Sequence, residues 1–500
     1  MINNISHWLD ETVNRLPDKV ALEDERTSVT FKEFRERALI VATELVKRKI
    51  FKSPIAVYMD KSVEEIETFL GVAYSGNFYS PIDVDMPVSR IEKIYEVLKP
   101  EIIITKTEYK SRIPLEYMNK IICLEDLKGK DVCEDIVYGQ RKHCCDRDLL
   151  YVLFTSGSTG VPKGVTICHQ SVIDYIDWVE KEFDFNSETI FGNQAPFYFD
   201  NSILDIYTTI KCGCCMNIIP KKLFSWPKIL LEYIEENHIN TIFWVPSALI
   251  LVSKMKALTK VDLRGKLNKI LFAGEVMPNK HLNVWRKYIP NAMYANLYGP
   301  TEITDVCCFY VVNRAFSDEE PLPIGNAMEN TDLIILDENG TISKKGDVGE
   351  LCIRGTSLSL GYYGNLERTK QAFVQNPLNN NYIEYIYKTG DLVKVNEYGE
   401  ILYVGRKDFQ IKHMGHRIEL GEIEIAISSI DGIAMCCCLY DDKREKIVVF
   451  IEEDMELNDL NELLKDMLPE YMLPNKLIHI AHMPLNLNGK IDRVKLKELL

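Results

Sequence analysis

The chain has 500 residues, of which 46% are hydrophobic and 27% charged, proportions that exclude a mainly disordered or fibrous protein. Lysine and arginine total 59 against 74 for aspartate and glutamate, so the formal charge is −15, which disfavours broad binding of nucleic acid or anionic membranes. The N-terminal residues lack the apolar core of a signal peptide, and the most apolar stretch (241–252) is too short to cross a bilayer. We therefore expect a cytoplasmic protein without a membrane span.

Helical and strand patterns alternate through the first 400 residues. The spacing predicts helices over residues 60–76 and 227–239, and strands over 151–158, 241–245 and 267–275. Such alternation predicts an α/β fold, in which helices flank parallel sheets.

Two later segments differ from this pattern. Between about residues 320 and 405, short strands broken by glycine or Asn-Gly predict a small β-rich subdomain. Residues 406–500 show a helix, a strand and a second helix, which predict a small α+β domain following an N-terminal core of residues 1–405.

The strongest local signal is the segment Thr155–Val165, which begins where the strand predicted within 151–158 runs into a turn. It combines three glycines with four hydroxyl residues and Lys163. Glycines let backbone N–H groups approach a ligand closely, and the hydroxyls and the lysine suit phosphate oxygens. The ending of a Walker A loop is missing. From composition alone, a flexible turn and a phosphate-binding loop both remain open.

The loop resembles the signature of the adenylate-forming superfamily, which includes acyl-CoA synthetases, luciferases and the amino-acid-activating domains of nonribosomal peptide synthetases. Further matches follow in the family's order from about residue 29 to 493. They comprise Asn296–Glu302, Tyr387–Leu392, Gly405–Lys412, Gly415–Glu419, Leu468–Pro474 and Asn488–Arg493, with weaker matches at Val29–Phe34 and Pro81–Asp83.

A stretch from Asn193 to Tyr207 distinguishes the branches of the superfamily. In amino-acid-activating members, the aspartate of a Phe-Asp-x-Ser motif binds the substrate's α-ammonium group, because a desolvated cation needs a partner charge. Asp200 matches that aspartate. A helix N-cap is the alternative interpretation of Asp200.

The chain most resembles stand-alone D-alanine–carrier protein ligases, and no carrier domain follows Arg493 in the sequence, so we expect a separate carrier protein. The resemblance implies a pocket lined by Asp200, Asn201, Leu204, Phe243, Leu271, Ala273, Leu297, Asp305, Val306 and Lys490. Two positions depart from those ligases. Ala273 stands where they carry a cysteine, and Asp305 where they carry a small apolar residue. If Asp305 points inward, it needs a hydroxyl or a cation as its partner; if outward, the pocket suits alanine or a modest aliphatic side chain.

The resemblance also implies the chemistry: a carboxylate attacks the α-phosphorus of ATP, and a phosphopantetheine thiol then attacks the aminoacyl-AMP. Glu302 would hold Mg²⁺, Tyr298 would stack on adenine, and Lys490 would bridge the substrate carboxylate and the α-phosphate. Asp391 and Arg406 would hold the ribose. The β- and γ-phosphates would lie on Thr155, Ser156, Thr159 and Lys163, and the remaining motif positions that we expect at the nucleotide are Gly157, Ser158, Gly160, Asn296, Gly299 and Thr301.

For the second step, the resemblance implies that the small C-terminal domain is mobile and rotates about the hinge residue Asp408, so that the loop at Gly415 replaces Lys490. We expect a monomer that acts on a small amino acid, D-alanine among the candidates. An aryl- or acyl-CoA ligase and a catalytically silent nucleotide-binding regulator are the alternatives. The sequence leaves open whether the pathway is teichoic acid D-alanylation or secondary metabolism.

Overall fold

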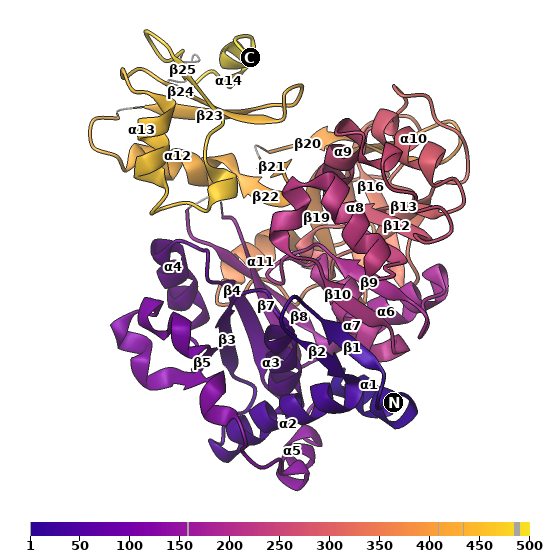
Figure 1. Cartoon of the computed structure of the whole chain (residues 1–500). Coiled ribbons are helices and arrows are strands. Elements are labelled where there is room, and N and C mark those ends of the chain that lie inside the picture. Colours follow the sequence, from indigo (N-terminus) through magenta and orange to yellow (C-terminus); the bar gives the residue numbers. More distant parts are fainter. Residues whose placement is uncertain (1, 158–159, 409, 434, 485–490) are drawn as a thin grey trace. The chain divides into compact units, whose positions relative to one another are not determined.

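The computed structural model describes residues 2–157, 160–408, 410–433, 435–484 and 491–500 (Figure 1). The chain divides into two compact units. The first comprises Met1–Asp83, Pro100–Leu153 and Val165–Gly405, and the second comprises Val84–Lys99, Phe154–Gly164 and Arg406–Leu500.

One large sheet has six strands in the order β6-β5-β3-β4-β7-β8. Strand β3 pairs in parallel with both β4 and β5, and its residues are almost all buried, as expected for a parallel sheet that is covered on both faces. The strands are β3 Pro54–Met59, β4 Phe78–Asp83, β5 Ile102–Thr105, β6 Ile121–Cys123, β7 Leu149–Thr155 and β8 Lys163–Cys168.

The second large sheet has nine strands in the order β15-β14-β13-β12-β11-β9-β10-β1-β2. Its central pairs are parallel, and antiparallel pairs close both edges. The strands are β1 Val20–Glu23, β2 Ser28–Thr30, β9 Ile190–Asn193, β10 Cys215–Ile218, β11 Thr241–Trp244, β12 Lys269–Ala273, β13 Met293–Tyr298, β14 Cys308–Val311 and β15 Asn326–Ala327.

Helices connect the strands of both large sheets. Helix α2 starts with a capping box between Thr30 and Glu33 and packs against α3, which in turn contacts β3 and β4 (Figure 1). The helices of this part are α1 Ser6–Arg15, α2 Phe31–Lys47, α3 Val63–Tyr74, α4 Val88–Leu98, α5 Glu134–Arg141, α6 His169–Phe183, α7 Ser202–Cys212, α8 Pro227–Glu236, α9 Pro246–Lys254 and α10 Asn279–Tyr288.

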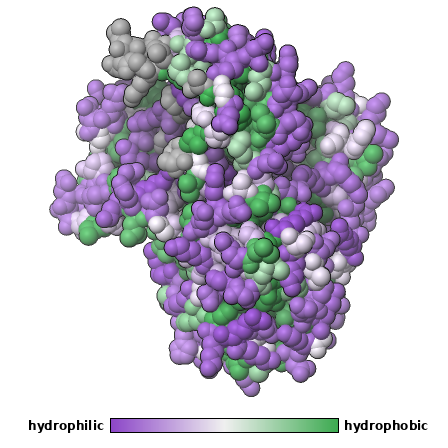
Figure 2. All heavy atoms as spheres, turned by 90° about the vertical axis from the view of Figure 1, so that its left-hand side faces the viewer, coloured by the Kyte–Doolittle hydropathy of each residue, from purple (hydrophilic) through white to green (hydrophobic). Residues whose placement is uncertain are grey.

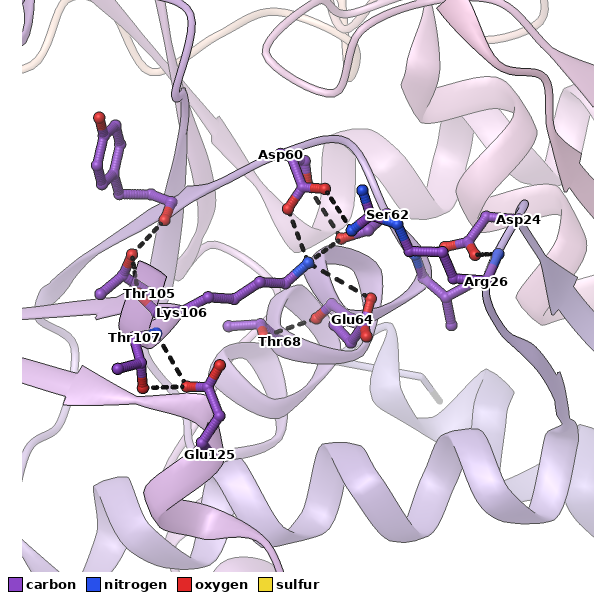
Figure 3. A network of polar contacts seen from close by, with 12 residues as sticks. Asp24, Arg26, Asp60, Ser62, Glu64, Thr68, Thr105, Lys106, Thr107 and Glu125 are labelled. Atoms are coloured by element: carbon purple, nitrogen blue, oxygen red, sulfur yellow. Dashed lines mark hydrogen bonds and ion pairs between the residues drawn. The ribbon is translucent and has the colours of Figure 1, made fainter. Parts of the chain in front are cut away.

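A polar network ties the two large sheets together at the start of α3 (Figure 3). The ammonium of Lys106, just after β5, lies 2.7 Å from Asp60 and 3.7 Å from Glu64. Burial by itself would lower the pKa of this ammonium. The hydrogen bond to Asp60 and the charges of the carboxylates outweigh that effect, so the pKa of Lys106 is raised. Asp24, which follows β1 in the other sheet, accepts a hydrogen bond from the Val63 N–H at the helix start. The network thereby fixes the first turn of α3 to both sheets.

A five-stranded antiparallel sheet completes the first unit, at the place of the predicted β-rich subdomain. Its strands are β16 Thr331–Leu336, β17 Gly349–Gly355, β18 Phe373–Gln375, β19 Tyr385–Val395 and β20 Ile401–Arg406, and helix α11 spans Leu366–Ala372.

The second unit has its own apolar core, built mainly by α12, β23 and β24. Its strands are β21 Gln410–His413, β22 His416–Glu419, β23 Cys436–Asp441, β24 Lys446–Ile451 and β25 Lys476–His479, and its helices are α4, α12 Leu420–Ser428, α13 Leu457–Leu464 and α14 Arg493–Lys497. The predicted fold class, an α/β core with a β-rich subdomain and a C-terminal α+β part, is confirmed.

Among the described residues, no helix has both the length and the apolar character needed to cross a membrane. The face shown in Figure 2 carries mainly hydrophilic residues, between which hydrophobic residues form smaller groups.

Candidate active site

Three neighbouring parallel strands present one apolar face. Phe243 of β11 stands beside Leu271 of β12, and Ala273 of β12 stands beside Leu297 of β13. Because side chains alternate along a strand, the intervening residues of β11 and β12 point to the opposite face and belong to a different core cluster. Leu204 and Val306 join the first cluster. The structure therefore brings the predicted apolar lining residues together.

Asp200 and Asn201 lie at the start of α7, beyond the carboxyl end of β9. The Asp200 side chain is 9% exposed, and one of its oxygens accepts the Asn201 N–H at 3.0 Å. The N-cap residue of α7 is Asn201, and no side-chain cap hydrogen bond is formed there. Asp200 therefore does not occupy the N-cap position that the alternative interpretation gave it.

A tight turn after β13 carries the next group of side chains. A Cβ at Gly299 would lie 2.2 Å from the Asp305 carbonyl oxygen, so this position requires glycine. Thr304 and Asp305 both have positive φ, 60° and 73°. The Cys307 N–H closes the turn on the Tyr298 carbonyl at 2.9 Å. This turn places Glu302 and Asp305 beside the end of β13.

Asp305 points into the protein interior. Its side chain is 2% exposed, and Oδ2 accepts the Tyr175 hydroxyl of α6 at 2.7 Å. Burial and the negative charge of Asp200 raise the pKa of Asp305 well above its usual value. The side chain is therefore buried with a hydroxyl as its partner, and its orientation toward the predicted pocket stays a prediction.

The predicted adenine and ribose residues meet in the first unit. The Tyr298 hydroxyl, at the end of β13, donates to the Asp391 carboxylate of β19. Burial and this carboxylate raise the pKa of Tyr298 well above its usual value, so the phenol keeps its proton. The Thr389 hydroxyl accepts the Asp391 N–H at 3.0 Å and fixes the backbone there. The nearby Asn296 amide donates to the Pro323 carbonyl at 2.8 Å.

Glu302 is fully buried, in the short helix Thr301–Ile303. Its Oε1 accepts the Tyr362 hydroxyl at 2.8 Å, and its carbonyl accepts the Ser359 N–H at 2.8 Å. Mg²⁺ is commonly bound by one or two carboxylates together with the phosphates of a substrate, and a carboxylate has several lone pairs. A buried carboxylate at this position fits such an ion.

The predicted phosphate loop joins β7 to β8 and belongs to the second unit. A Cβ at Gly157 would lie 2.0 Å from the Val161 carbonyl oxygen, and Gly160 has a φ of 74°. The loop geometry therefore requires both glycines. The Thr155 hydroxyl is buried and finds no partner among the described residues.

Groups of the C-terminal segment occupy the donors of this loop. The Gly157 N–H donates to Glu422 at 3.2 Å, and the Lys163 ammonium lies 3.5 Å from Glu419. The Ser156 hydroxyl donates to the Arg417 carbonyl at 2.7 Å and accepts the Glu419 N–H at 3.1 Å.

A buried ion pair also holds the Glu422 carboxylate in place. Arg90 of α4 lies 2.6 Å from Glu422, and the two side chains are 4% and 5% exposed.

The predicted hinge and its following loop have defined local structure. Asp408 forms two hydrogen bonds of 2.7 Å with the Arg406 guanidinium. Burial disfavours the Asp408 carboxylate, yet the hydrogen bonds from Arg406 outweigh it and lower the pKa of Asp408. Met414 and Gly415 form the two-residue turn between β21 and β22, with φ of 51° and 81°.

The structure thus distributes the predicted site residues over its two units. The pocket residues, Asn296, Tyr298, Gly299, Thr301, Glu302 and Asp391 belong to the first, and Thr155, Ser156, Gly157, Gly160, Lys163, Arg406, Asp408 and Gly415 to the second. Ser158, Thr159 and Lys490 lie outside the described residues.

Sequence reasoning missed Tyr175 and Tyr362, whose hydroxyls hold Asp305 and Glu302. It also missed Arg90, Glu419 and Glu422 beside the phosphate loop. No spacing rule marks these residues, because each lies far along the chain from its partner.

Comparisons with known proteins agree with this arrangement. The protein-family model described as AMP-binding enzyme matches residues 9–363. A D-alanine–D-alanyl carrier protein ligase of Bacillus cereus (strain AH187) is 32% identical over 511 residues, covering 99% of this chain and 98% of that protein. The zwittermicin A synthase ZmaJ of Bacillus cereus is 31% identical over 509 residues, covering 98% and 94%.

Two solved structures share the fold. The Vibrio cholerae adenylation domain AlmE, in complex with glycyl-adenosine-5'-phosphate, has a TM-score of 0.84 at 21% identity and covers 100% of this chain and 98% of its own. IdnL1 has a TM-score of 0.83 at 24% identity, covering 97% and 99%. Because the family model spans more than half of the residues and both relatives are similar over almost the whole length, the chain belongs to the AMP-binding enzyme family.

Proposed function

We propose that this chain activates a small amino acid with ATP as an aminoacyl adenylate and transfers the aminoacyl group to the phosphopantetheine thiol of a carrier protein. One observation carries the proposal: the buried Asp200 carboxylate lies just before α7, whose Leu204 belongs to the same apolar cluster as Phe243 and Leu271, in the same unit as the Tyr298–Asp391 pair. A carboxylate in an apolar pocket suits an α-ammonium group, which aryl and fatty acids lack.

In the first half-reaction, a carboxylate oxygen of the amino acid bonds to the α-phosphorus, and pyrophosphate leaves. Asp200 holds the ammonium group and Asp391 accepts the ribose hydroxyls. Bound at Glu302, Mg²⁺ would supply charge neutralisation between the two anionic reactants. Positioning and electrostatic stabilisation dominate such phosphoryl chemistry, and Lys163 and Lys490 add positive charge for it.

In the second half-reaction, the thiol sulfur of the carrier bonds to the carbonyl carbon, and AMP leaves. One relative supports a carrier as the acceptor: the Bacillus cereus ligase is named for its D-alanyl carrier protein. Between the two half-reactions, the C-terminal domain would rotate about Asp408, and the loop at Gly415 would then replace Lys490.

The proposal is tested by ATP–pyrophosphate exchange with both enantiomers of the proteinogenic amino acids, β-alanine, short diamino acids, and aryl and fatty acids. We expect exchange with an amino acid and a loss of at least about 100-fold in the Asp200→Asn variant. Exchange with aryl or fatty acids alone would contradict the role of Asp200 and indicate an aryl- or acyl-CoA ligase.

Transfer is tested separately, by incubating the enzyme, ATP and the radiolabelled amino acid with phosphopantetheinylated carrier protein. We expect label on the carrier and none on a carrier whose phosphopantetheine serine is replaced by alanine. Label on free coenzyme A but never on the carrier would contradict the proposed acceptor.

A further inference from the structure

Asp305 places a second carboxyl group in the interior that contains Asp200. Its Oδ2 accepts the Tyr175 hydroxyl at 2.7 Å. Its Oδ1 is buried and finds no hydrogen-bond partner among the described residues. An unpaired buried acceptor costs free energy, which a donor on a ligand would restore.

Two further polar side-chain atoms, the Asn201 Nδ2 and the Tyr151 hydroxyl, are also buried without a hydrogen-bond partner among the described residues. The Asn201 Nδ2 would lie 3.9 Å from a Cβ at Gly274, directly after the pocket residue Ala273. Burial raises the pKa of Tyr151 well above its usual value, and the charges of Asp200 and Asp305 add to this effect.

After burial, the charged groups among the described residues that act on Asp305 are carboxylates. Asp200 and Asp205 both raise the pKa of Asp305, and no lysine or arginine in the described ranges forms an ion pair with it. The described residues therefore provide a single hydroxyl for a carboxyl group that has two oxygens.

We propose that the amino acid activated by this chain carries a hydrogen-bond donor on its side chain, a hydroxyl or an ammonium group, and that Asp305 accepts it. The inference rests on the proposed function, in which Asp200 holds the α-ammonium. An apolar analogue would leave Oδ1 unpaired, and sites built to hydrogen-bond a substrate group reject the analogue without it by up to about 10⁴–10⁵-fold. A purely apolar pocket discriminates by only about 10–200-fold per methylene.

The test compares kcat/KM in pyrophosphate exchange for side chains of matched size. Serine and 2,3-diaminopropionate are compared with 2-aminobutyrate, and homoserine and 2,4-diaminobutyrate with norvaline, each in both enantiomers. We expect one donor-bearing amino acid to exceed its apolar match, and alanine, by at least about 100-fold.

Two variants assign the preference to Asp305. Because its φ is 73°, asparagine and glycine are the replacements that fit the backbone. Asp305→Gly removes the carboxyl group and should reduce the preference at least 10-fold. Asp305→Asn keeps an acceptor without charge, so a hydroxyl substrate should lose less than about 10-fold and an ammonium substrate at least about 100-fold.

Asp205→Asn is the matched control, because Asp205 is also a buried carboxylate with one oxygen held (by the Asn193 amide at 2.8 Å) and one oxygen without a partner among the described residues, but it is not one of the predicted pocket residues. It should leave the ratio of donor-bearing to apolar substrates unchanged. Near-equal rates for an apolar match, or an unchanged preference in Asp305→Gly, would overturn the inference and leave the proposed function standing. Exchange with no amino acid would instead defeat the proposed function.

Discussion

Gly299 has no room for a side chain. An added Cβ would contact the Asp305 carbonyl oxygen at 2.2 Å and the Val306 Cα at 2.8 Å, and both are backbone atoms that cannot rotate away. The turn that carries Glu302 and Asp305 therefore exists in its present form only with glycine at this position.

Gly299→Ala should lower amino-acid-dependent pyrophosphate exchange by at least about 100-fold, because shifts of about 1 Å at a reacting site cost that much. The matched control is Gly139→Ala in helix α5, where an added Cβ meets nothing within 4 Å. This control should keep full activity and gain about 0.5–1 kcal/mol in the free energy of unfolding. Equal activity in the two variants would contradict the role of the turn.

Asp205 shows how burial shifts a carboxyl group. Desolvation raises its pKa from 3.8 to about 7, although the Asn193 hydrogen bond and Lys61 oppose the shift. Since the folded pKa lies above the unfolded one, the folded state binds the proton more tightly. The stabilisation is present below the unfolded pKa and is lost as the pH rises to about 7.

The free energy of unfolding of the native protein, minus that of Asp205→Asn, should therefore fall as the pH rises from about 4 to 7 and stay constant above. Urea unfolding at several pH values measures this difference. A difference that rises over the same range would show that the carboxylate, rather than the protonated acid, is favoured in the fold.

At the scale of elements, periodicity located the regular structure well. The helix predicted over 60–76 is α3, Val63–Tyr74, and the strand predicted over 267–275 is β12, Lys269–Ala273. The amphipathic pattern of α3 nevertheless indicates a polar face, and the structure buries that face as well, including Glu65 and Glu67. Burial of both faces depends on tertiary contacts, such as the Arg37–Glu67 ion pair, that periodicity does not contain.

In the candidate site, too, tertiary contacts decide what the sequence pattern cannot predict. The ordered motifs, and the family resemblance that they carry, predicted Asp200, Leu271 and Asp305 as pocket residues. They left the orientation of Asp305 open, because it depends on Tyr175, 130 residues away along the chain.

Helices α4 and α12 are joined by one buried charge pair, Arg90 with Glu422. Glu422→Leu should lower the free energy of unfolding of the second unit by about 3–5 kcal/mol, because it removes the carboxylate that pairs with a buried guanidinium. The double variant Arg90→Met, Glu422→Leu should recover much of that loss. Chemical denaturation followed by hydrogen exchange in α12 measures both; additive losses in the double variant would contradict the coupling.

At the scale of the whole molecule, the two half-reactions separate the roles of distant motifs. Lys490→Ala should lower adenylate formation by about 10²–10³-fold and spare transfer from preformed aminoacyl-AMP, because the lysine is expected to act only in the first half-reaction, where it bridges the substrate carboxylate and the α-phosphate. Lys495→Ala, a change at an exposed lysine near the same terminus that pairs with Asp492 at 3.7 Å, is the control and should affect neither step. Equal losses in both half-reactions would contradict the division of roles.

The phosphate loop has a consequence for how nucleotide affinity is interpreted. In this structure, Glu422 and Glu419 already hold the Gly157 N–H and the Lys163 ammonium. If the triphosphate of ATP binds this loop, it enters by anion exchange: each phosphate oxygen replaces a carboxylate that belongs to the same chain. A dissociation constant measured on the whole enzyme then reports the difference between two free energies, that of phosphate binding to these donors and that of carboxylate binding to them. Weak measured affinity for ATP can therefore coexist with a loop that binds phosphate strongly.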